Sequence, residues 1–202
     1  MKDKNRLRHE HDHGGIERQK QGISSFNRYD TERVFAALAL KEGCSFLDLG
    51  CGAGDYSLEA AKIVGPSGTV YALDQWEEVI AIVTGKAHTA KLHNVKGITS
   101  DISSSLPFED KSIDVCFIAQ VLHGLDLSGD TGTLLNELVR IIKPGGKLAI
   151  IEFKKEETGF GPPLEIRVPP QEVEKAMKEY GFEKTGITDL GHSYMIQFKR
   201  TY

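Results

Sequence analysis

The sequence predicts an α/β fold with a mostly parallel sheet of about seven strands, helices on both faces of the sheet and an antiparallel C-terminal hairpin. Two patterns predict this class. Short apolar runs alternate with stretches of helical period through most of the chain, which indicates right-handed crossovers between parallel strands. Two strand-like runs joined by a very short turn then close the sequence, and a turn of that length permits only antiparallel pairing.

The chain is expected to consist of an arm followed by one domain. Residues 1–25 are mostly charged residues, His and Gln without a hydrophobic period, which predicts a flexible, His-rich amino-terminal arm. Residues 26–202 are expected to form a single domain around one core, because the whole chain of 202 residues is 40% hydrophobic and 27% charged.

The first elements follow from local signals. "TERVFAALAL" has apolar residues at helical spacing after the cap signal of Asp30 and Thr31, and "KEG" ends that helix. "CSFLDLG" is an apolar run that enters glycines and predicts a strand. "GDYSLEAAKIVG" predicts a helix closed by Gly65 and Pro66. "GTVYALD" predicts a second strand, and "EEVIAIVTGKAHTAKL" predicts a helix that continues through Gly85.

The later elements repeat the alternation and then depart from it. "NVKGITSD" and the apolar "SIDVCFIAQ" predict two strands. "TGTLLNELVRIIKPGG" predicts a helix with Leu134, Leu138 and Ile141 on one face, ended by Pro-Gly-Gly, and "KLAIIEFK" predicts the next strand. "PQEVEKAMKEYG" predicts the last helix. "FEKTGITDLG" and "SYMIQFKR" predict the hairpin, with its turn around Gly191 and His192.

Composition narrows the class of partner and the compartment. The net charge is −4 and the isoelectric point is about 6.0, so no nucleic acid is expected as a partner and no membrane insertion is expected. The three cysteines contain no CxxC pair and are interpreted as small buried hydrophobes. The apolar runs are too short to span a bilayer, and the polar start does not read as a signal peptide. We therefore expect a cytoplasmic protein, monomeric or homodimeric.

The stretch "FLDLGCGAGDYS" carries the main chemical signal. A strand that ends in Gly50, Gly52 and Gly54 and opens a helix places backbone N–H groups and the positive helix end beside a ligand. A dinucleotide fingerprint has glycine at its sixth position, where this chain has Asp55. An acid at that point would repel a pyrophosphate but tolerate an ammonium or a sulfonium. This difference favours a cationic nucleotide-bearing cofactor.

Two more acids follow the next two strands. Asp74 ends "YALD", where a carboxylate can accept both hydroxyls of a ribose. Asp101 ends "TSD", where it could accept the exocyclic amine of adenine, and Ile102 would pack on the ring. Each acid alone is more often a turn or cap residue. Acids at the ends of three successive strands, beside a glycine loop, favour a nucleoside site.

Four blocks together resemble the class I S-adenosylmethionine-dependent methyltransferases: "LDLGCGAGDYS", "YALDQ", "SDISSSLPFEDKSIDVCFIAQVLHGL" and "ELVRIIKPGGKLAIIEF". Among these enzymes the chain looks most similar to small-molecule methyltransferases typified by the quinone-biosynthesis C-methyltransferases. The resemblance implies a Rossmann-like fold, the cofactor S-adenosylmethionine, the product S-adenosylhomocysteine, and in-line attack of a small-molecule acceptor on the sulfonium methyl.

Residue by residue, the resemblance implies a cofactor site. The glycine loop would hold the methionine moiety, the acid after the second strand the ribose, and the acid–Ile pair the adenine. Tyr29 could close over the methionine end, and Ala119 and Gln120 would lie near the methyl group. The full set of candidate cofactor-binding residues is Tyr29, Asp48, Gly50, Gly52, Asp55, Asp74, Gln75, Asp101, Ile102, Ala119 and Gln120.

The acceptor side is less determined. His123 in "AQVLHGLDL" is the best candidate for a catalytic base, although a histidine packed against the sheet explains it as well. Glu152 is a second possible acceptor contact. The segment "KKEETGFGPPLEIRVPP" is long and rich in Pro and Gly, so it is expected to form a lid or pocket wall, and Phe160 within it suggests a partly apolar acceptor.

Other interpretations stay open at this level. A nicotinamide-dependent oxidoreductase and a non-catalytic S-adenosylmethionine-binding regulator both suit the same architecture. The tract "HEHDH" has His9, His11 and His13 at alternate positions, a composition that can bind transition metals weakly. A stable metal site needs ligands held by a fold, so the tract is interpreted as a solvated arm, and no metal site is predicted.

Overall fold

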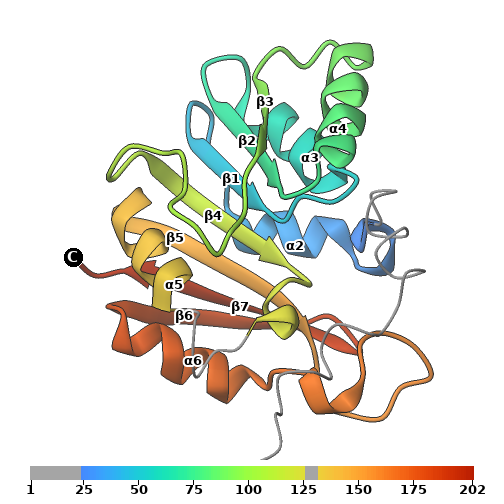
Figure 1. The fold of residues 1–202 in the computed structure, drawn as a ribbon, viewed down its shortest axis with the longest axis vertical. Coiled ribbons are helices and arrows are strands. Elements are labelled where there is room, and N and C mark those ends of the chain that lie inside the picture. The colour runs from blue at the N-terminus through green and yellow to red at the C-terminus, as the bar shows by residue number, and fades with distance from the viewer. Residues whose placement is uncertain (1–23, 126–131) are drawn as a thin grey trace, which may run out of the picture.

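The computed structural model describes residues 24–125 and 132–202, and these residues contain a seven-stranded sheet in the order β3-β2-β1-β4-β5-β7-β6 (Figure 1). The strands are β1 Ser45–Leu49, β2 Thr69–Asp74, β3 Val95–Thr99, β4 Ile113–Ala119, β5 Ile142–Phe153, β6 Phe182–Asp189 and β7 Ser193–Arg200. The α-helices are α2 Thr31–Leu38, α3 Asp55–Val64, α4 Glu77–Thr89, α5 Gly132–Ile141 and α6 Pro170–Glu179. The short 3-10 turns are η2 Phe26–Arg28, η3 Leu122–Gly124 and η4 Leu164–Ile166.

Strand pairing confirms the predicted fold class. β3, β2, β1, β4 and β5 pair in parallel, whereas β7 is antiparallel to both β5 and β6. The chain runs from β1 outward to β3 and then crosses back to β4 on the other side of β1. In sheets of this kind the crevice at the carboxyl end of the strands beside that reversal is the usual ligand site. A ligand site of this kind would therefore lie at the carboxyl ends of β1 and β4.

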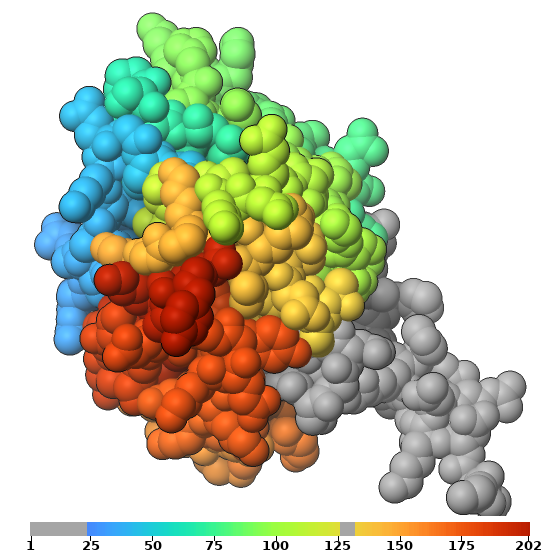
Figure 2. Space-filling view, turned by 90° about the vertical axis from the view of Figure 1, so that its left-hand side faces the viewer, coloured from blue at the N-terminus to red at the C-terminus, as the bar shows by residue number. Residues whose placement is uncertain are grey.

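Two layers of helices cover the sheet because alternate residues of each strand point to opposite faces. Phe46 of β1 packs in a core with α2 and α3, whereas Leu47 and Leu49 pack in a core with α5 and α6. α4 closes a third, smaller core over β2. Figure 2 shows how the blue-to-green first half of the chain packs above the orange and red carboxyl-terminal elements.

Three expected element boundaries are wrong, each for a local reason. α2 ends at Leu38 because Ala39 adopts a left-handed conformation with φ 46°. α4 ends at Thr89 and not at the expected "KL". α5 ends at Ile141, and "KPGG" lies inside β5 as an irregularity, where the pairing with β4 jumps from Ile142 to Lys147. The helix thus ends just before Pro-Gly-Gly, and these residues form an irregularity at the start of β5.

Other expectations hold. Asp30 Oδ1 accepts a hydrogen bond from the backbone N–H of Arg33 at 3.2 Å and so caps α2 as predicted. α4 continues through Gly85 as predicted, and a Cβ added there would meet no atom within 4 Å, so no neighbour requires glycine at that position. Within the two described ranges, every helix is too short or too polar to cross a lipid bilayer. Most of the predicted His-rich arm lies outside the described residues.

Candidate functional site

The glycine loop after β1 is built on left-handed backbone. Gly50, Gly52 and Gly54 have φ values of 78°, 50° and 76°, a region that favours glycine. A Cβ on Gly50 would lie 2.5 Å from Cγ2 of Val121, and one on Gly54 would lie 2.6 Å from Cγ2 of Val83. Close packing against the protein itself therefore explains two of these glycines, a reason that the sequence pattern did not reveal.

Asp48 supports this loop from inside the protein. Its side chain is only 1% exposed, and its Oδ2 accepts a hydrogen bond from Ser57 Oγ at 2.6 Å, which links β1 to α3. Burial raises the pKa of Asp48 to about 7, and the nearby carboxylates of Asp74 and Asp55 add to the effect, while the Ser57 bond opposes it. The site therefore contains a buried carboxyl that titrates near neutrality.

Asp74 joins the glycine loop to the ends of β2 and β3. Its Oδ2 accepts from the N–H of Gly52 at 3.1 Å, and its Oδ1 accepts from the N–H of Trp76 at 3.2 Å. Its backbone carbonyl accepts from the N–H of Ser100 at 3.0 Å, beside Asp101. The carboxylate is thus held at the sheet edge with its side chain only partly covered. Gln75, next to it, is exposed.

Asp55 forms an ion pair within the protein, which the sequence did not predict. Its Oδ1 lies 2.9 Å from Lys86 Nζ, and the same ammonium donates to the carbonyl of Ala53. Lys86 therefore compensates the negative charge that was expected to repel a pyrophosphate. The argument that Asp55 by itself selects a cationic cofactor loses its force, because the local charge of the pair is near zero.

The predicted adenine-contacting pair lies one strand further along the same edge. Asp101 is exposed and its Oδ1 accepts from the N–H of Ser103 at 2.8 Å, the geometry of a carboxyl-stabilised turn. Ile102 is half-buried and packs against the α5–α6 core. Since Asp74 pairs with Thr99, two residues before Asp101, the structure brings both predicted acids to neighbouring strand ends.

The amino-terminal segment reaches the end of β4 through Tyr29. Its hydroxyl lies 2.9 Å from Ser193 Oγ and accepts from Gln120 Nε2 at 2.9 Å. Gln120 follows Ala119, the last residue of β4, and has a left-handed φ of 61°, a strained value for a residue other than glycine. Burial raises the pKa of Tyr29, so its phenol stays protonated at neutral pH.

His123 and Glu152, predicted separately, lie together. His123 Nδ1 is 2.9 Å from Glu152 Oε2. Glu152 Oε1 also accepts from the backbone N–H of Leu122 at 2.7 Å, so this carboxylate fixes both the turn η3 and the imidazole ring. The two residues come from adjacent strand ends, since Ala119 pairs with Ile151.

Comparison with known proteins decides the family. Residues 40–196 match the model of the family described as "Methyltransferase domain". A solved S-adenosylmethionine-dependent methyltransferase from Aquifex aeolicus superposes with a TM-score of 0.81 at 32% identity, covering 92% of this chain and 98% of that one. The chain belongs to the class I S-adenosylmethionine-dependent methyltransferases. This confirms the family that the sequence blocks indicated.

Curated relatives of this methyltransferase add a narrower likeness. The demethylmenaquinone methyltransferase of Staphylococcus aureus is 36% identical over 132 residues, which are 64% of this chain and 52% of the relative. The chain therefore spans about half the length of the curated relatives it matches. A geranyl diphosphate C-methyltransferase from Streptomyces coelicolor, at a TM-score of 0.69 and 16% identity over 84% of this chain and 78% of that one, shares the fold.

The segment after β5 is fastened by a residue that sequence reasoning missed. Arg167 is buried and donates to the carbonyls of Glu156, Pro162 and Phe160 at 2.7, 2.8 and 2.9 Å, and to Thr158 Oγ1 at 2.6 Å. Its guanidinium also lies 5.0 Å from the ring centre of Phe153. No local pattern marks an arginine for this role, because its partners are carbonyls of a loop without regular structure.

This loop presents an aromatic side chain at the same edge of the sheet. Phe160 is 52% exposed, and its ring centre lies 5.9 Å from Phe153 and 5.3 Å from His192 in edge-to-face contacts. The loop that the sequence predicted as a pocket wall is therefore ordered around Arg167. It keeps an apolar group at the carboxyl end of β5, packed on Phe153.

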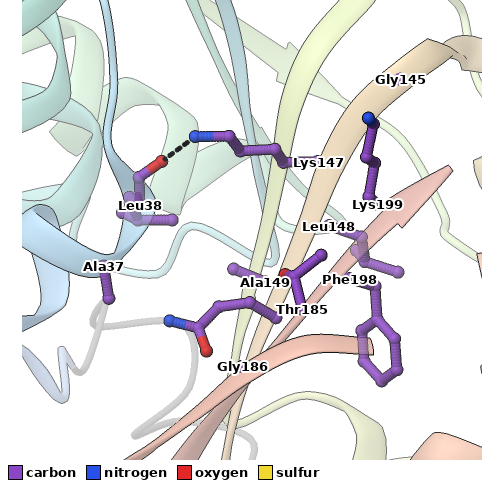
Figure 3. Close-up of a pocket in the computed structure, with 11 residues that line it drawn as sticks. Ala37, Leu38, Gly145, Lys147, Leu148, Ala149, Thr185, Gly186, Phe198 and Lys199 are labelled. Carbon is purple, nitrogen blue, oxygen red and sulfur yellow. Dashed lines mark hydrogen bonds between the residues drawn. The ribbon is translucent and has the colours of Figure 1, made fainter. Parts of the chain in front are cut away.

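One cavity lies away from this edge (Figure 3). Its volume is about 480 Å³, and its walls come from α2, from β5 around Lys147, and from the β6–β7 hairpin. Lys147 Nζ donates to the carbonyl of Leu38 at 3.1 Å, at the end of α2. None of the predicted site residues lines this cavity, so it is separate from the chemistry at the carboxyl edge.

Proposed function

We propose that this methyltransferase transfers the methyl group of S-adenosylmethionine to a small, partly apolar acceptor. The observation that supports it most is the placement of Asp74, which is bonded to the glycine loop through Gly52 and to the Asp101 turn through Ser100. Through its carboxylate and its backbone carbonyl, this one residue joins the strand ends where the family holds its cofactor. The family assignment also favours this activity over the nicotinamide-dependent alternative.

The residues at this edge suit the chemistry of the cofactor. Asp74 keeps a partly exposed carboxylate for ribose hydroxyls, and Asp101 keeps an exposed one for the adenine amine. Ile102 provides apolar surface for the ring. The start of α3 and its glycine loop would receive the methionine end. These assignments remain proposals for each residue, as does the contribution of Asp48 from beneath the loop.

Positioning and exclusion of water would supply much of the acceleration. Bound S-adenosylmethionine supplies an activated methyl group and a good leaving sulfide. Tyr29 and Gln120 join the amino-terminal segment to the end of β4, where they would shield the reacting atoms from water. Ala119 and the strained backbone of Gln120 would present main-chain groups beside the methyl group. An acceptor held in line then attacks without a large reorganisation.

The acceptor class follows from the loop and from the relatives. The Staphylococcus aureus relatives are named for demethylmenaquinone, and this chain orders an exposed Phe160 at its acceptor edge. A small molecule with an apolar ring suits that surface. We further propose a cytoplasmic protein, monomeric or homodimeric, without a nucleic-acid partner, in keeping with its net charge of −4.

Calorimetric titration tests the cofactor assignment. S-adenosylhomocysteine is expected to bind, NAD is not, and Asp74→Asn is expected to weaken binding by about 1–3 kcal/mol through the loss of a charge-assisted hydrogen bond. Asp110→Asn removes the same charge from an exposed residue that pairs with Arg140, and it serves as the matched control. Binding of NAD without S-adenosylhomocysteine would overturn the proposal. Tight binding without methylation of any acceptor would instead support the regulator.

A further inference from the structure

Two side chains of α5 fasten the connection between β3 and β4. Residues 100–112, all of which the structure describes, lead from one strand to the other through turns and bends alone. Helices and sheets satisfy their own backbone groups, whereas a connection of this length needs partners from elsewhere. Glu137 and Arg140 provide several of these partners, and we call the two residues the α5 clamp. They lie in the block "ELVRIIKPGG", outside the residues proposed above to contact the cofactor.

Glu137 holds the part of the connection nearest to Asp101. Its Oε2 accepts from the backbone N–H of Leu106 at 2.6 Å and from Ser105 Oγ at 3.2 Å. The side chain of Glu137 is 13% exposed, and its hydrogen bonds with the Arg140 guanidinium lower its pKa to about 2. The carboxylate is therefore ionised at neutral pH and can accept from both donors.

Arg140 holds the same segment through its carbonyls. Nη2 donates to the carbonyl of Leu106 at 2.9 Å and Nη1 to that of Phe108 at 2.6 Å, while Nε and Nη2 bond to the two oxygens of Glu137. Only a planar guanidinium presents enough donors in fixed directions for this set. Asp110 also pairs with Arg140, but its side chain is 71% exposed, so solvent screens the pair and it adds little to the clamp.

Packing supports the residues that the clamp holds. Leu106 is buried in the core that α5 shares with the sheet. The ring centre of Phe108 lies 5.2 Å from that of Tyr71 of β2 in an edge-to-face contact. The middle of the connection is therefore fixed to both α5 and the sheet.

The turn that carries Asp101 lies between two anchors. On one side the N–H of Ser100 donates to the carbonyl of Asp74 at 3.0 Å, and on the other side the α5 clamp holds Leu106. Asp101 Oδ1 accepts from the N–H of Ser103, and Oδ2 has no partner in the part of the chain that the structure describes. Because Asp101 is itself exposed, the direction of its carboxylate depends on the two anchors and not on packing of its own side chain.

We infer that Glu137 and Arg140 are positioning residues for the adenine end of the cofactor and give the site its preference for a base with an exocyclic amine. The inference rests on the proposed function and names residues that determine its cofactor specificity. A carboxylate favours an amine over a carbonyl only while its oxygen stays at hydrogen-bond distance from the donor. A turn released from α5 would have to be ordered again by each ligand, and that ordering lowers the affinity.

Two substitutions loosen the clamp. Arg140→Lys keeps the charge, but a single ammonium cannot serve both carbonyls and Glu137 together. Glu137→Gln keeps the shape of the side chain and removes the charge that Arg140 and the Leu106 N–H share; this variant decides the question if Arg140→Lys does not fold. Arg167→Lys is the matched control for the first, because Arg167 fastens the carbonyls of a different loop. Glu59→Gln is the control for the second, because Glu59 also pairs with a cation three residues later on its helix.

The ratio of two affinities provides the readout. S-inosylhomocysteine has a carbonyl oxygen where S-adenosylhomocysteine has the adenine amine, and calorimetry gives the Kd of each. Wild type is expected to favour S-adenosylhomocysteine by at least about tenfold, because the amine donates to a carboxylate and the carbonyl cannot. Both clamp variants are expected to bind S-adenosylhomocysteine more weakly, and their ratio should be at least about threefold smaller than that of wild type. The two control variants should keep the wild-type ratio.

A double-mutant cycle shows whether the clamp acts through Asp101. Asp101→Ala is expected to abolish most of the preference, and adding Arg140→Lys to it should lower the ratio no further. The N–H groups of Ser103 and Ser104 close the Asp101 turn. Their amide hydrogen exchange in the ligand-free protein should rise severalfold in Arg140→Lys, while β1 keeps its protection.

The outcomes separate the inference from the proposed function. Clamp variants that keep the wild-type ratio, or that weaken both ligands by the same factor, would overturn the inference and leave the cofactor assignment standing. A wild type that binds both ligands equally would show that Asp101 does not select the amine, and the inference would fall with that role. Failure of the wild type to bind S-adenosylhomocysteine would count against the proposed function itself.

Discussion

Asp48 makes the stability of the fold depend on pH in an unusual direction. Burial raises the pKa of this carboxyl from an ordinary value of 3.8 to about 7 in the folded chain. Between about pH 4 and 7 the folded state therefore still holds the proton of Asp48, whereas the unfolded state has released it. Under linkage, the free energy of unfolding contributed by Asp48 falls as pH rises through that window, and it is constant below and above it.

The magnitude follows from the two pKa values. Each pH unit between them is worth about 1.36 kcal/mol, so a separation of about three units gives about 4 kcal/mol. Asp48→Asn is neutral at every pH and can still accept the hydroxyl hydrogen of Ser57. The variant is therefore expected to gain stability over wild type as pH rises, by up to about 4 kcal/mol at pH 8 relative to pH 4.

Urea unfolding at half-unit steps from pH 4 to 8.5 measures this difference. Carboxyls that do not interact with Asp48 titrate alike in both proteins, such as Glu137, whose pKa the Arg140 guanidinium lowers to about 2, so their effects cancel in the comparison. Asp110→Asn controls for the loss of one surface charge. Parallel stability profiles for wild type and Asp48→Asn would refute the reasoning, since they would show that the buried carboxyl is ionised in the folded state throughout.

Three further predictions concern the edge of the sheet. Gly50→Ala is expected to destabilise the fold by about 2–5 kcal/mol, because alanine is strained at a left-handed φ and its Cβ would contact Cγ2 of Val121. In a double-mutant cycle, Val121→Ala should recover about 1–3 kcal/mol of that loss. Additive losses would contradict the contact. Tyr29→Phe removes the hydrogen bonds to Ser193 and Gln120 and is expected to speed proteolysis of the amino-terminal segment. The global free energy of unfolding should fall by less than about 2 kcal/mol. Unchanged cleavage would show that packing alone holds the segment. Arg167→Lys keeps the charge but cannot donate hydrogen bonds to the same set of carbonyls. Amide hydrogen exchange in residues 154–167 should therefore rise at least tenfold, while exchange in β1 stays constant. Equal exchange in the variant and the wild type would mean that other contacts hold the loop.

Local physics made most of the fold predictable from sequence. Each strand and helix shows its own period, and the direction of each crossover follows from the twist of the chain, so the sheet and its hairpin edge could be expected before any coordinates. The errors fall where two patterns coincide. "KPGG" ends a helix, as predicted, but the same residues also form a bulge, because Ile142 already pairs with Ile113 of the neighbouring strand.

The site shows the same division between local and long-range information. The neighbouring positions of Asp74 and Asp101 were predictable, because strand ends in a parallel sheet share one edge. The compensation of Asp55 by Lys86 was not, since the two residues lie 31 positions apart and only the packing of α3 on α4 brings them together. A charged residue at a motif position can thus be neutralised by an ion pair inside the protein.

The His123–Glu152 contact carries this argument further. Each residue had a weak individual signal, and a histidine packed against the sheet explained the first equally well. The sequence separates them by 29 residues, whereas the parallel pairing of β4 with β5 sets their strand ends side by side. The contact between the two side chains therefore depends on the register of β4 against β5, which neither local sequence reveals. A side-chain pair of this kind is therefore recognised from two adjacent strand ends and not from one motif.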